Sequence, residues 1–242
     1  VVGAAQTLRS HAVRTTGIAE SQLPALLGEY AAEIDGMRVS YQPSPSGVDV
    51  RLTISGVTHE EAERRLRQAG DELRARIGVS VYGADEQDLA GIVLQACRGR
   101  GWHIAVAESC TGGLLGERLT SIPGASDVFV GGVIAYDNRV KEALLGVSHA
   151  DLVEHGAVSE SVARAMAHGA RRATGAEIGL AITGVAGPDG GTSEKPVGLV
   201  WLAVDTPIGA KTYGGRLIGD RGEIRYRATQ SVLDMLRRML GG

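Results

Sequence analysis

Aromatic side chains are scarce in this sequence. Phe, Trp and Tyr make up 4% of its 242 residues, and Phe129 is the single phenylalanine. Proteins that bind single-stranded nucleic acid stack the bases on aromatic rings, and the formal net charge of −3 offers no basic excess for a phosphate backbone. We therefore do not expect nucleic acid as the main partner.

Cysteines and long apolar runs are few as well. Two thiols, Cys97 and Cys110, make no disulfide framework in a chain of this length, which favours a reducing, cytoplasmic compartment. No run approaches the roughly 18 uncharged apolar residues of a membrane-spanning helix, so we expect no membrane partner. The six histidines lack the ligand spacing of a metal site, and we expect neither a metal nor another cofactor.

Residues 18–84 predict a small α+β domain. The expected elements are a helix at 21–32, strands at 37–41 and 48–54, a helix opened by a capping box at 58–61, and a strand at 79–82. Residues 1–17 hold one strand pattern and no signal-peptide pattern. We interpret them as the remnant or linker of a missing N-terminal domain.

Helical patterns alternate with buried apolar strands in residues 85–242. Such alternation predicts a sheet covered by helices on both faces. The last two strands, 197–204 and 211–217, follow each other without a helix between them, which indicates a mixed sheet. The predicted fold class is therefore α/β, a three-layer α/β/α domain with a mixed sheet, preceded by the small α+β domain.

One stretch of the second domain, residues 105–113, combines a strand, a tight turn and the start of a helix. The apolar strand breaks at Glu108-Ser109 into small residues, and a helical pattern begins near Thr111. A helix start leaves backbone N–H groups unpaired, which suits a developing oxyanion. Ser109 is either a nucleophile or an N-cap serine, and spacing alone favours the cap.

Two other strands of this domain end in polar side chains. Tyr136 follows one strand, with Lys141 about one helical turn later, and Thr183 ends another. Neighbouring parallel strands would bring these side chains together with Ser109. Serine and lysine form a known nucleophile–base pair, because burial lowers the pKa of the lysine. The simpler alternative is an exposed helix lysine.

Further candidates surround this point. Cys110 is a rival nucleophile, because a helix start would lower the pKa of its thiol. The glycine-rich loop 184–191 is either a phosphate cradle or a long turn, and it matches neither standard nucleotide fingerprint. Arg221, at the start of the last helix, either contacts an anion or is a surface arginine.

Several motifs resemble the competence/damage-inducible CinA family. In chain order they are Ala107-Glu-Ser-Cys-Thr-Gly-Gly113, Tyr136-Asp-Asn-Arg-Val-Lys141, His155-Gly-Ala-Val-Ser159, Thr183-Gly-Val-Ala-Gly-Pro-Asp-Gly-Gly191 and Lys195-Pro-Val-Gly198. The resemblance covers about residues 85–240, and residues 18–83 resemble the KH-type middle domain of long family members. The KH RNA-binding loop needs G-x-x-G, which this segment lacks, so we expect a role in packing or dimer geometry.

The resemblance implies a nicotinamide-nucleotide amidase, which converts nicotinamide mononucleotide to nicotinic acid mononucleotide and ammonia. It implies Ser109 as nucleophile and Lys141 as its proton acceptor, supported by Tyr136 and Thr183. The implied substrate contacts are Thr111, Gly112, Gly113, Gly184, Gly187 and Arg221.

An alternative function is a non-catalytic regulatory module that binds pyridine nucleotides. Family precedent favours a homodimer. Long family members also carry a molybdopterin-binding-like domain associated with metal-dependent ADP-ribose hydrolysis. This sequence lacks that domain, so we expect it to lack that activity.

Overall fold

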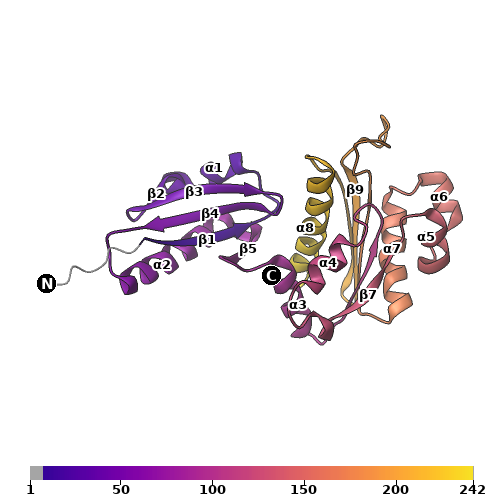
Figure 1. Cartoon of the computed structure of the whole chain (residues 1–242), viewed down its shortest axis with the longest axis horizontal. Coiled ribbons are helices and arrows are strands. Elements are labelled where there is room, and N and C mark those ends of the chain that lie inside the picture. The colour runs from indigo at the N-terminus through magenta and orange to yellow at the C-terminus, as the bar shows by residue number, and fades with distance from the viewer. Residues whose placement is uncertain (1–7, 242) are drawn as a thin grey trace. The chain divides into compact units, whose positions relative to one another are not determined.

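The structure is a computed structural model that describes residues 8–241 and falls into two compact units. The first ends at Asp88 and the second begins at Leu89 (Figure 1). Each unit has its own five-stranded sheet and its own hydrophobic core. None of the helices in residues 8–241 is long and apolar enough to cross a membrane.

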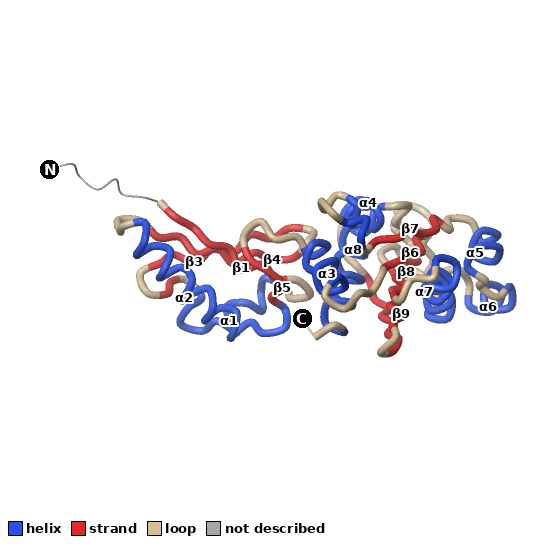
Figure 2. Tube along the Cα trace, turned by 90° about the horizontal axis from the view of Figure 1, so that it is seen from below, coloured by secondary structure: helices blue, strands red, loops and turns tan. Residues whose placement is uncertain are grey.

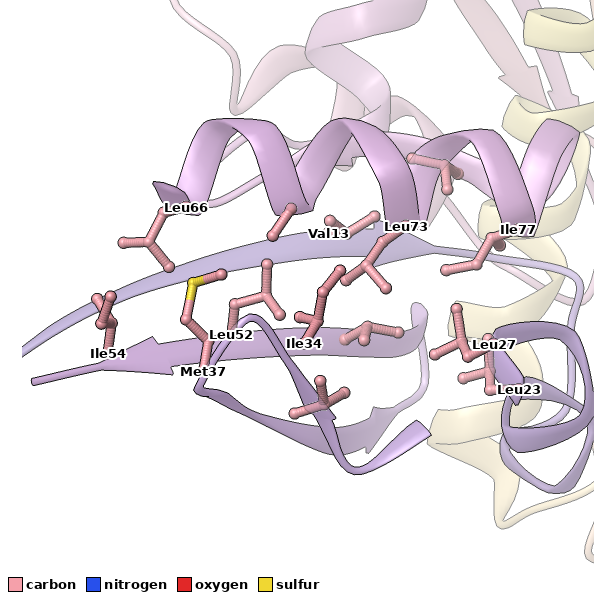
Figure 3. Packing of buried hydrophobic residues seen from close by; sticks show 14 of the residues in the cluster. Val13, Leu23, Leu27, Ile34, Met37, Leu52, Ile54, Leu66, Leu73 and Ile77 are labelled. Atoms are coloured by element: carbon pink, nitrogen blue, oxygen red, sulfur yellow. The ribbon is translucent and has the colours of Figure 1, made fainter. Parts of the chain in front are cut away.

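The first unit packs helices on one face of an antiparallel sheet with the strand order β2-β3-β4-β1-β5. Its elements are β1 (Arg9–Thr15), α1 (Leu23–Leu27), β2 (Glu33–Ile34), β3 (Met37–Ser44), β4 (Gly47–Ile54), α2 (His59–Ile77) and β5 (Val81–Ala84). Alternate residues of β4 are buried, and Leu52 faces Leu66 and Leu73 of α2 in the core (Figure 3). The period-two pattern of this strand predicts that face correctly.

β1 corrects the domain boundary that the sequence predicts. It pairs with β4 along its whole length and with β5 on its other side, and Val13 is fully buried in the core of this unit. The expectation that residues 1–17 lie outside the small domain is therefore wrong for residues 9–15. The partners of β1 are distant in sequence, so no local pattern reveals them. Residues 1–7 lie outside the described part.

The helix expected at 21–32 is broken into three short pieces. The pieces are a 3₁₀ turn at Glu20–Gln22, α1, and a second 3₁₀ turn at Gly28–Ala31. Gly28 ends α1 with a φ of 58°, a conformation that glycine adopts at little cost. Leu23 and Leu27 are buried as the apolar spacing predicts, whereas Leu26 is exposed and the interruption is not predicted.

The second unit is a sheet covered by helices on both faces, which confirms the predicted three layers. Its elements are α3 (Leu89–Arg98), β6 (Ile104–Glu108), α4 (Leu114–Thr120), β7 (Phe129–Ile134), α5 (Asn138–Leu145), α6 (His149–His155), α7 (Glu160–Thr174), β8 (Ile178–Gly184), β9 (Leu199–Thr206), β10 (Gly209–Arg216) and α8 (Arg221–Met239). In Figure 1, α3, α4 and α8 lie on one side of the sheet, and α5, α6 and α7 lie on the other.

The sheet of this unit is mixed, as predicted, with the strand order β10-β9-β8-β6-β7. Figure 2 shows β7, β6, β8 and β9 in this order. β6 runs parallel to β7 and β8, whereas β9 runs antiparallel to β8 and β10. Glycines let α7 pack closely against β8 and α5. A Cβ on Gly179 of β8 would lie 2.0 Å from the Ala167 oxygen of α7. Likewise, a Cβ on Gly169 would lie 2.1 Å from the Leu145 oxygen.

This strand order determines which loops meet. β7, β6 and β8 are adjacent and parallel, so their carboxyl ends share one edge of the sheet. Ser109 follows β6, Tyr136 follows β7, and Thr183 is the second-last residue of β8. The edge formed by these three strand ends is the candidate functional site.

Candidate functional site

The turn after β6 presents Ser109 at the sheet edge. The Ser109 amide donates to the Ile182 carbonyl of β8 at 2.9 Å, and the Gly112 amide donates to the Ser109 carbonyl at 3.1 Å. Gly113, with a φ of 98°, is the N-cap of α4. Ser109 is therefore not the N-cap serine of the simpler alternative. Its half-buried side chain is available for chemistry.

Glu108 is a buried carboxylate that the sequence reasoning missed. Its side chain is only 1% exposed. Oε2 accepts from the amides of Gly113 at 3.1 Å and Leu115 at 3.0 Å, and Oε1 accepts from the Gly116 amide at 2.8 Å. These are the N-terminal amides of α4, which a charged acceptor satisfies well. The signal in the sequence was a glutamate that ends an otherwise apolar strand directly before the turn.

This capping changes the expected oxyanion site. The Gly113 amide binds Glu108 and the Gly112 amide binds the Ser109 carbonyl, so neither is free for substrate as predicted. Within residues 8–241, the amides of Cys110 and Thr111 form no backbone hydrogen bond to another residue. They are the backbone donors left at the turn.

Lys141 is buried, although exposure is the rule for lysine. It lies on α5, whose N-cap is Asp137, and its side chain is 1% exposed. Nζ donates to the Ala135 carbonyl at 2.8 Å and the Tyr136 carbonyl at 3.3 Å. Burial lowers the pKa of Lys141, against the opposing charges of Asp137 and the nearby Cys110.

Ser109 and Lys141 are not hydrogen-bonded to each other anywhere in the described residues; the bonds of Nζ go to the two carbonyls. A neutral lysine amine has two N–H groups and one lone pair. The carbonyls of Ala135 and Tyr136 accept both N–H groups, which leaves the lone pair as an acceptor. The two carbonyls thus orient Nζ as a base, and catalytic hydrogen bonds often tighten only with substrate bound.

The lowered pKa of Lys141 leads to a testable pH dependence. If neutral Lys141 is the base, kcat/KM for ammonia release rises with pH, with a midpoint below the value of about 10.4 for an exposed lysine. The reason is that burial disfavours the ammonium form. A pH–rate profile of the wild type measures the midpoint.

Lys141→Met is the matched variant, because methionine is an unbranched apolar side chain suited to the same buried space. It is expected to remove the rising limb of the profile together with nearly all activity. An unchanged profile in Lys141→Met would show that another group is the base.

Cys110 does not have the reactive thiol that a helix start would produce. The side chain is 7% exposed, and burial raises the pKa of Cys110 to about 11, an effect that the charge of Glu108 adds to and that Arg225 and Arg221 oppose. At neutral pH the residue is a thiol, and the thiolate is the nucleophilic form. The environment of the turn therefore favours Ser109 over Cys110.

Arg221 joins two of the predicted loops. Nη1 donates to the Gly187 carbonyl at 2.6 Å, and Nη2 donates to the Tyr136 hydroxyl at 3.3 Å. Arg221 is the first residue of α8, whose N-cap Asp220 forms a capping box with Glu223. The glycine loop after β8, the segment after β7 and the start of α8 therefore meet at one guanidinium.

Thr183 and Gly184 make structural contacts. The Thr183 hydroxyl donates to the Ala157 carbonyl at 2.8 Å. Its proton is therefore bound to the loop before α7. A Cβ on Gly184 would lie 2.6 Å from the Val200 side chain, so close packing on β9 requires glycine there. Gly187 has a φ of 76°, and a Cβ there would meet Val197 at 2.6 Å.

Thr111 connects the turn to α8 through a second arginine, Arg225. Arg225 Nη2 donates to the Thr111 carbonyl at 2.6 Å, and the Thr111 side chain is fully buried. Gly112 lies beside the same guanidinium with a φ of 58°. The four-residue spacing from Arg221 was the available signal, because it places both arginines on one face of α8.

An open groove of about 1060 Å³ lies elsewhere on this unit, between α7 and β9. Arg164, His168, Trp201 and Asp205 are among the residues that line it, and none of the predicted site residues does. Within residues 8–241, no three His, Cys, Asp or Glu side chains come together as a metal site. The candidate site is therefore defined by the contacts at the strand ends and not by the depth of a hollow.

The fold and this sheet edge define an α/β domain with a serine turn beside a buried lysine, joined to a KH-like unit. Residues 86–240 match the family model of the CinA C-terminal domain, and residues 10–83 match the model of the KH domain of damage-inducible protein CinA. The chain belongs to the CinA family.

Two relatives show how much of a longer protein is represented. A CinA-like protein of Gemmatimonas aurantiaca is 52% identical over 231 residues, which are 96% of this chain and 54% of the relative. A CinA-like protein of Prochlorococcus marinus is 45% identical over 240 residues, or 98% of this chain and 56% of the relative. The chain spans about half the length of the curated relatives it matches.

Solved structures of CinA proteins are similar to about two thirds of this chain. The competence/damage-inducible protein CihA from Agrobacterium tumefaciens is 40% identical with a TM-score of 0.61, covering 64% of this chain and 94% of its own. A CinA superfamily protein from Klebsiella pneumoniae is 33% identical with a TM-score of 0.62, covering 64% and 99%. These names state no reaction.

Proposed function

We propose that this chain is an amidohydrolase that converts nicotinamide mononucleotide to nicotinic acid mononucleotide and ammonia. The observation that carries the proposal is the buried Lys141, which forms no ion pair within residues 8–241 and donates instead to two carbonyls beside the serine turn. An uncompensated buried ammonium is costly. A neutral amine poised as a base accounts for its retention.

In the proposed reaction, Ser109 Oγ attacks the carboxamide carbon while the neutral amine of Lys141 accepts the hydroxyl proton. The amides of Cys110 and Thr111 stabilise the tetrahedral oxyanion. The Lys141 ammonium then protonates the leaving nitrogen, and ammonia departs. Water hydrolyses the acyl-enzyme, with Lys141 again accepting the proton.

The nucleotide part of the substrate is inferred from the family resemblance and from charge. Arg221 and Arg225 both lie close enough to the turn to lower the pKa of Cys110, although burial dominates there. The guanidinium of Arg221 suits a phosphate. In this proposal the phosphate rests beside Arg221 and the loop at Gly187, with the carboxamide at Ser109.

A coupled ammonia assay with nicotinamide mononucleotide tests the proposal. The wild type is expected to release one ammonia per nicotinic acid mononucleotide formed, with turnover that saturates in substrate. Calorimetry on the same preparation measures binding. Saturable binding without ammonia release would instead identify the non-catalytic regulatory module and contradict the amidase.

A further inference from the structure

The first two turns of α8 tie together all three loops of the site. Arg221 donates to Gly187 and Tyr136, in the segments that follow β8 and β7. One helical turn later, Arg225 Nη2 donates to the Thr111 carbonyl at 2.6 Å, in the turn that follows β6. Of these three contacts, the one made by Arg225 reaches the segment that carries the candidate nucleophile.

The contact made by Arg225 is poorly explained by stability. Arg225 Nε and the Thr111 hydroxyl are buried and have no hydrogen-bond partner among the described residues, and such atoms lower stability. Arg237, on the same helix, shows the stabilising arrangement, with Nη2 2.7 Å from the Asp234 carboxylate. Arg225 instead directs its charge to one carbonyl of the nucleophile turn.

A short chain of bonds leads from Arg225 to Ser109. The Thr111 carbonyl and the Gly112 amide belong to one planar peptide group. Arg225 holds the carbonyl on one side of that group, and the amide on the other side donates to the Ser109 carbonyl at 3.1 Å. The orientation of this single peptide therefore couples the guanidinium to the backbone of Ser109.

Glycine at position 112 permits the backbone conformation that this peptide requires. Its φ of 58° is strained for residues with a side chain. A Cβ at this position would lie in ordinary contact with Arg225, 3.8 Å from Nη2. Within the turn, the Leu114 amide also donates to the Thr111 carbonyl, at 3.2 Å. Arg225 adds a charged contact from α8 at 2.6 Å, which helps to keep the Thr111 carbonyl away from the space that an oxyanion would occupy.

We propose that Arg225 is a positioning residue that holds the Thr111–Gly112 peptide in the orientation that aligns Ser109 and keeps the turn amides directed at the substrate. This inference rests on the proposed amidase function. It assigns to Arg225 a task distinct from that of Arg221, because Arg225 acts through the backbone of the turn.

Arg225→Ala is expected to lower kcat for ammonia release about 100-fold, since small misplacements of a reacting group have effects of this size. KM is expected to change less than about threefold, and added guanidinium ion is expected to restore part of kcat. Arg227→Ala is the matched control: Arg227 also has a buried, unpaired Nε, but lies two residues on, across the helix. It is expected to retain wild-type kcat.

A serine-directed fluorophosphonate, followed by intact mass, measures alignment of Ser109 without the nucleotide. Arg225→Ala is expected to label at least about tenfold more slowly than the wild type and Arg227→Ala, with its thermal midpoint close to that of Arg227→Ala. Wild-type rates in both assays, or a raised KM with full kcat, would overturn the positioning role alone. A wild type that is neither labelled nor active would overturn the amidase function and this inference with it.

Discussion

Ser109→Ala is expected to abolish ammonia release from nicotinamide mononucleotide, with kcat at least about 1000-fold below the wild type, as for loss of other serine nucleophiles. The variant keeps the backbone contacts of the turn, because the Ser109 amide and carbonyl form its bonds to Ile182 and Gly112. Nucleotide affinity measured by calorimetry is therefore expected to stay within about threefold of the wild type.

Cys110→Ala is the matched control for this experiment. The thiol is the adjacent side chain and is protonated at neutral pH, because burial raises the pKa of Cys110 to about 11. Its removal is expected to leave most of the activity. Loss of ammonia release in Cys110→Ala with activity retained in Ser109→Ala would reverse the assignment and refute the serine–lysine mechanism.

Glu108→Ala is expected to destabilise the second unit by about 3–5 kcal/mol, because three amides at the start of α4 lose a buried, charged acceptor. Chemical denaturation followed by circular dichroism measures the loss. Hydrogen exchange of the Leu115 and Gly116 amides localises it, and both are expected to exchange much faster. Activity is expected to fall with it, since the turn that carries Ser109 begins at Glu108.

Glu117→Ala serves as the control on the same helix. Glu117 is exposed, and its replacement is expected to change the free energy of unfolding by no more than about 0.5 kcal/mol. Glu108→Gln keeps one acceptor oxygen and is expected to lie between the two. Equal stability of Glu108→Ala and Glu117→Ala would show that the buried carboxylate does not support the turn.

The layers of the second unit were predictable, because alternation of helical and apolar strand patterns is a local property of the chain. So was the mixed sheet, since the chain between 199–206 and 209–216 is too short for a crossover helix. The main wrong prediction was that the segment containing β1 lies outside the small domain. The two partners of this strand, β4 and β5, lie far along the chain, and strand pairing at that separation leaves no local pattern.

In the candidate site, the positions of the residues were predictable from the sequence and their hydrogen bonds were not. The sequence placed Ser109 and Tyr136 at strand ends and Lys141 about one helical turn after Tyr136, and the structure makes the two strands neighbours. The sequence did not predict which hydrogen bonds these groups make. The Gly113 amide, expected to bind an oxyanion, donates to the Glu108 carboxylate. The Thr183 hydroxyl donates to the Ala157 carbonyl.

The sequence by itself determined the residue types at the turn after β6 and the elements around them, because side-chain periodicity and turn chemistry act over a few residues. Only the tertiary structure decided what surrounds Ser109. It brought Lys141 into a buried position between two carbonyls and set Arg225 on the Thr111 carbonyl. Burial and hydrogen-bond partners depend on segments distant along the chain, and those two quantities set the chemistry of the site.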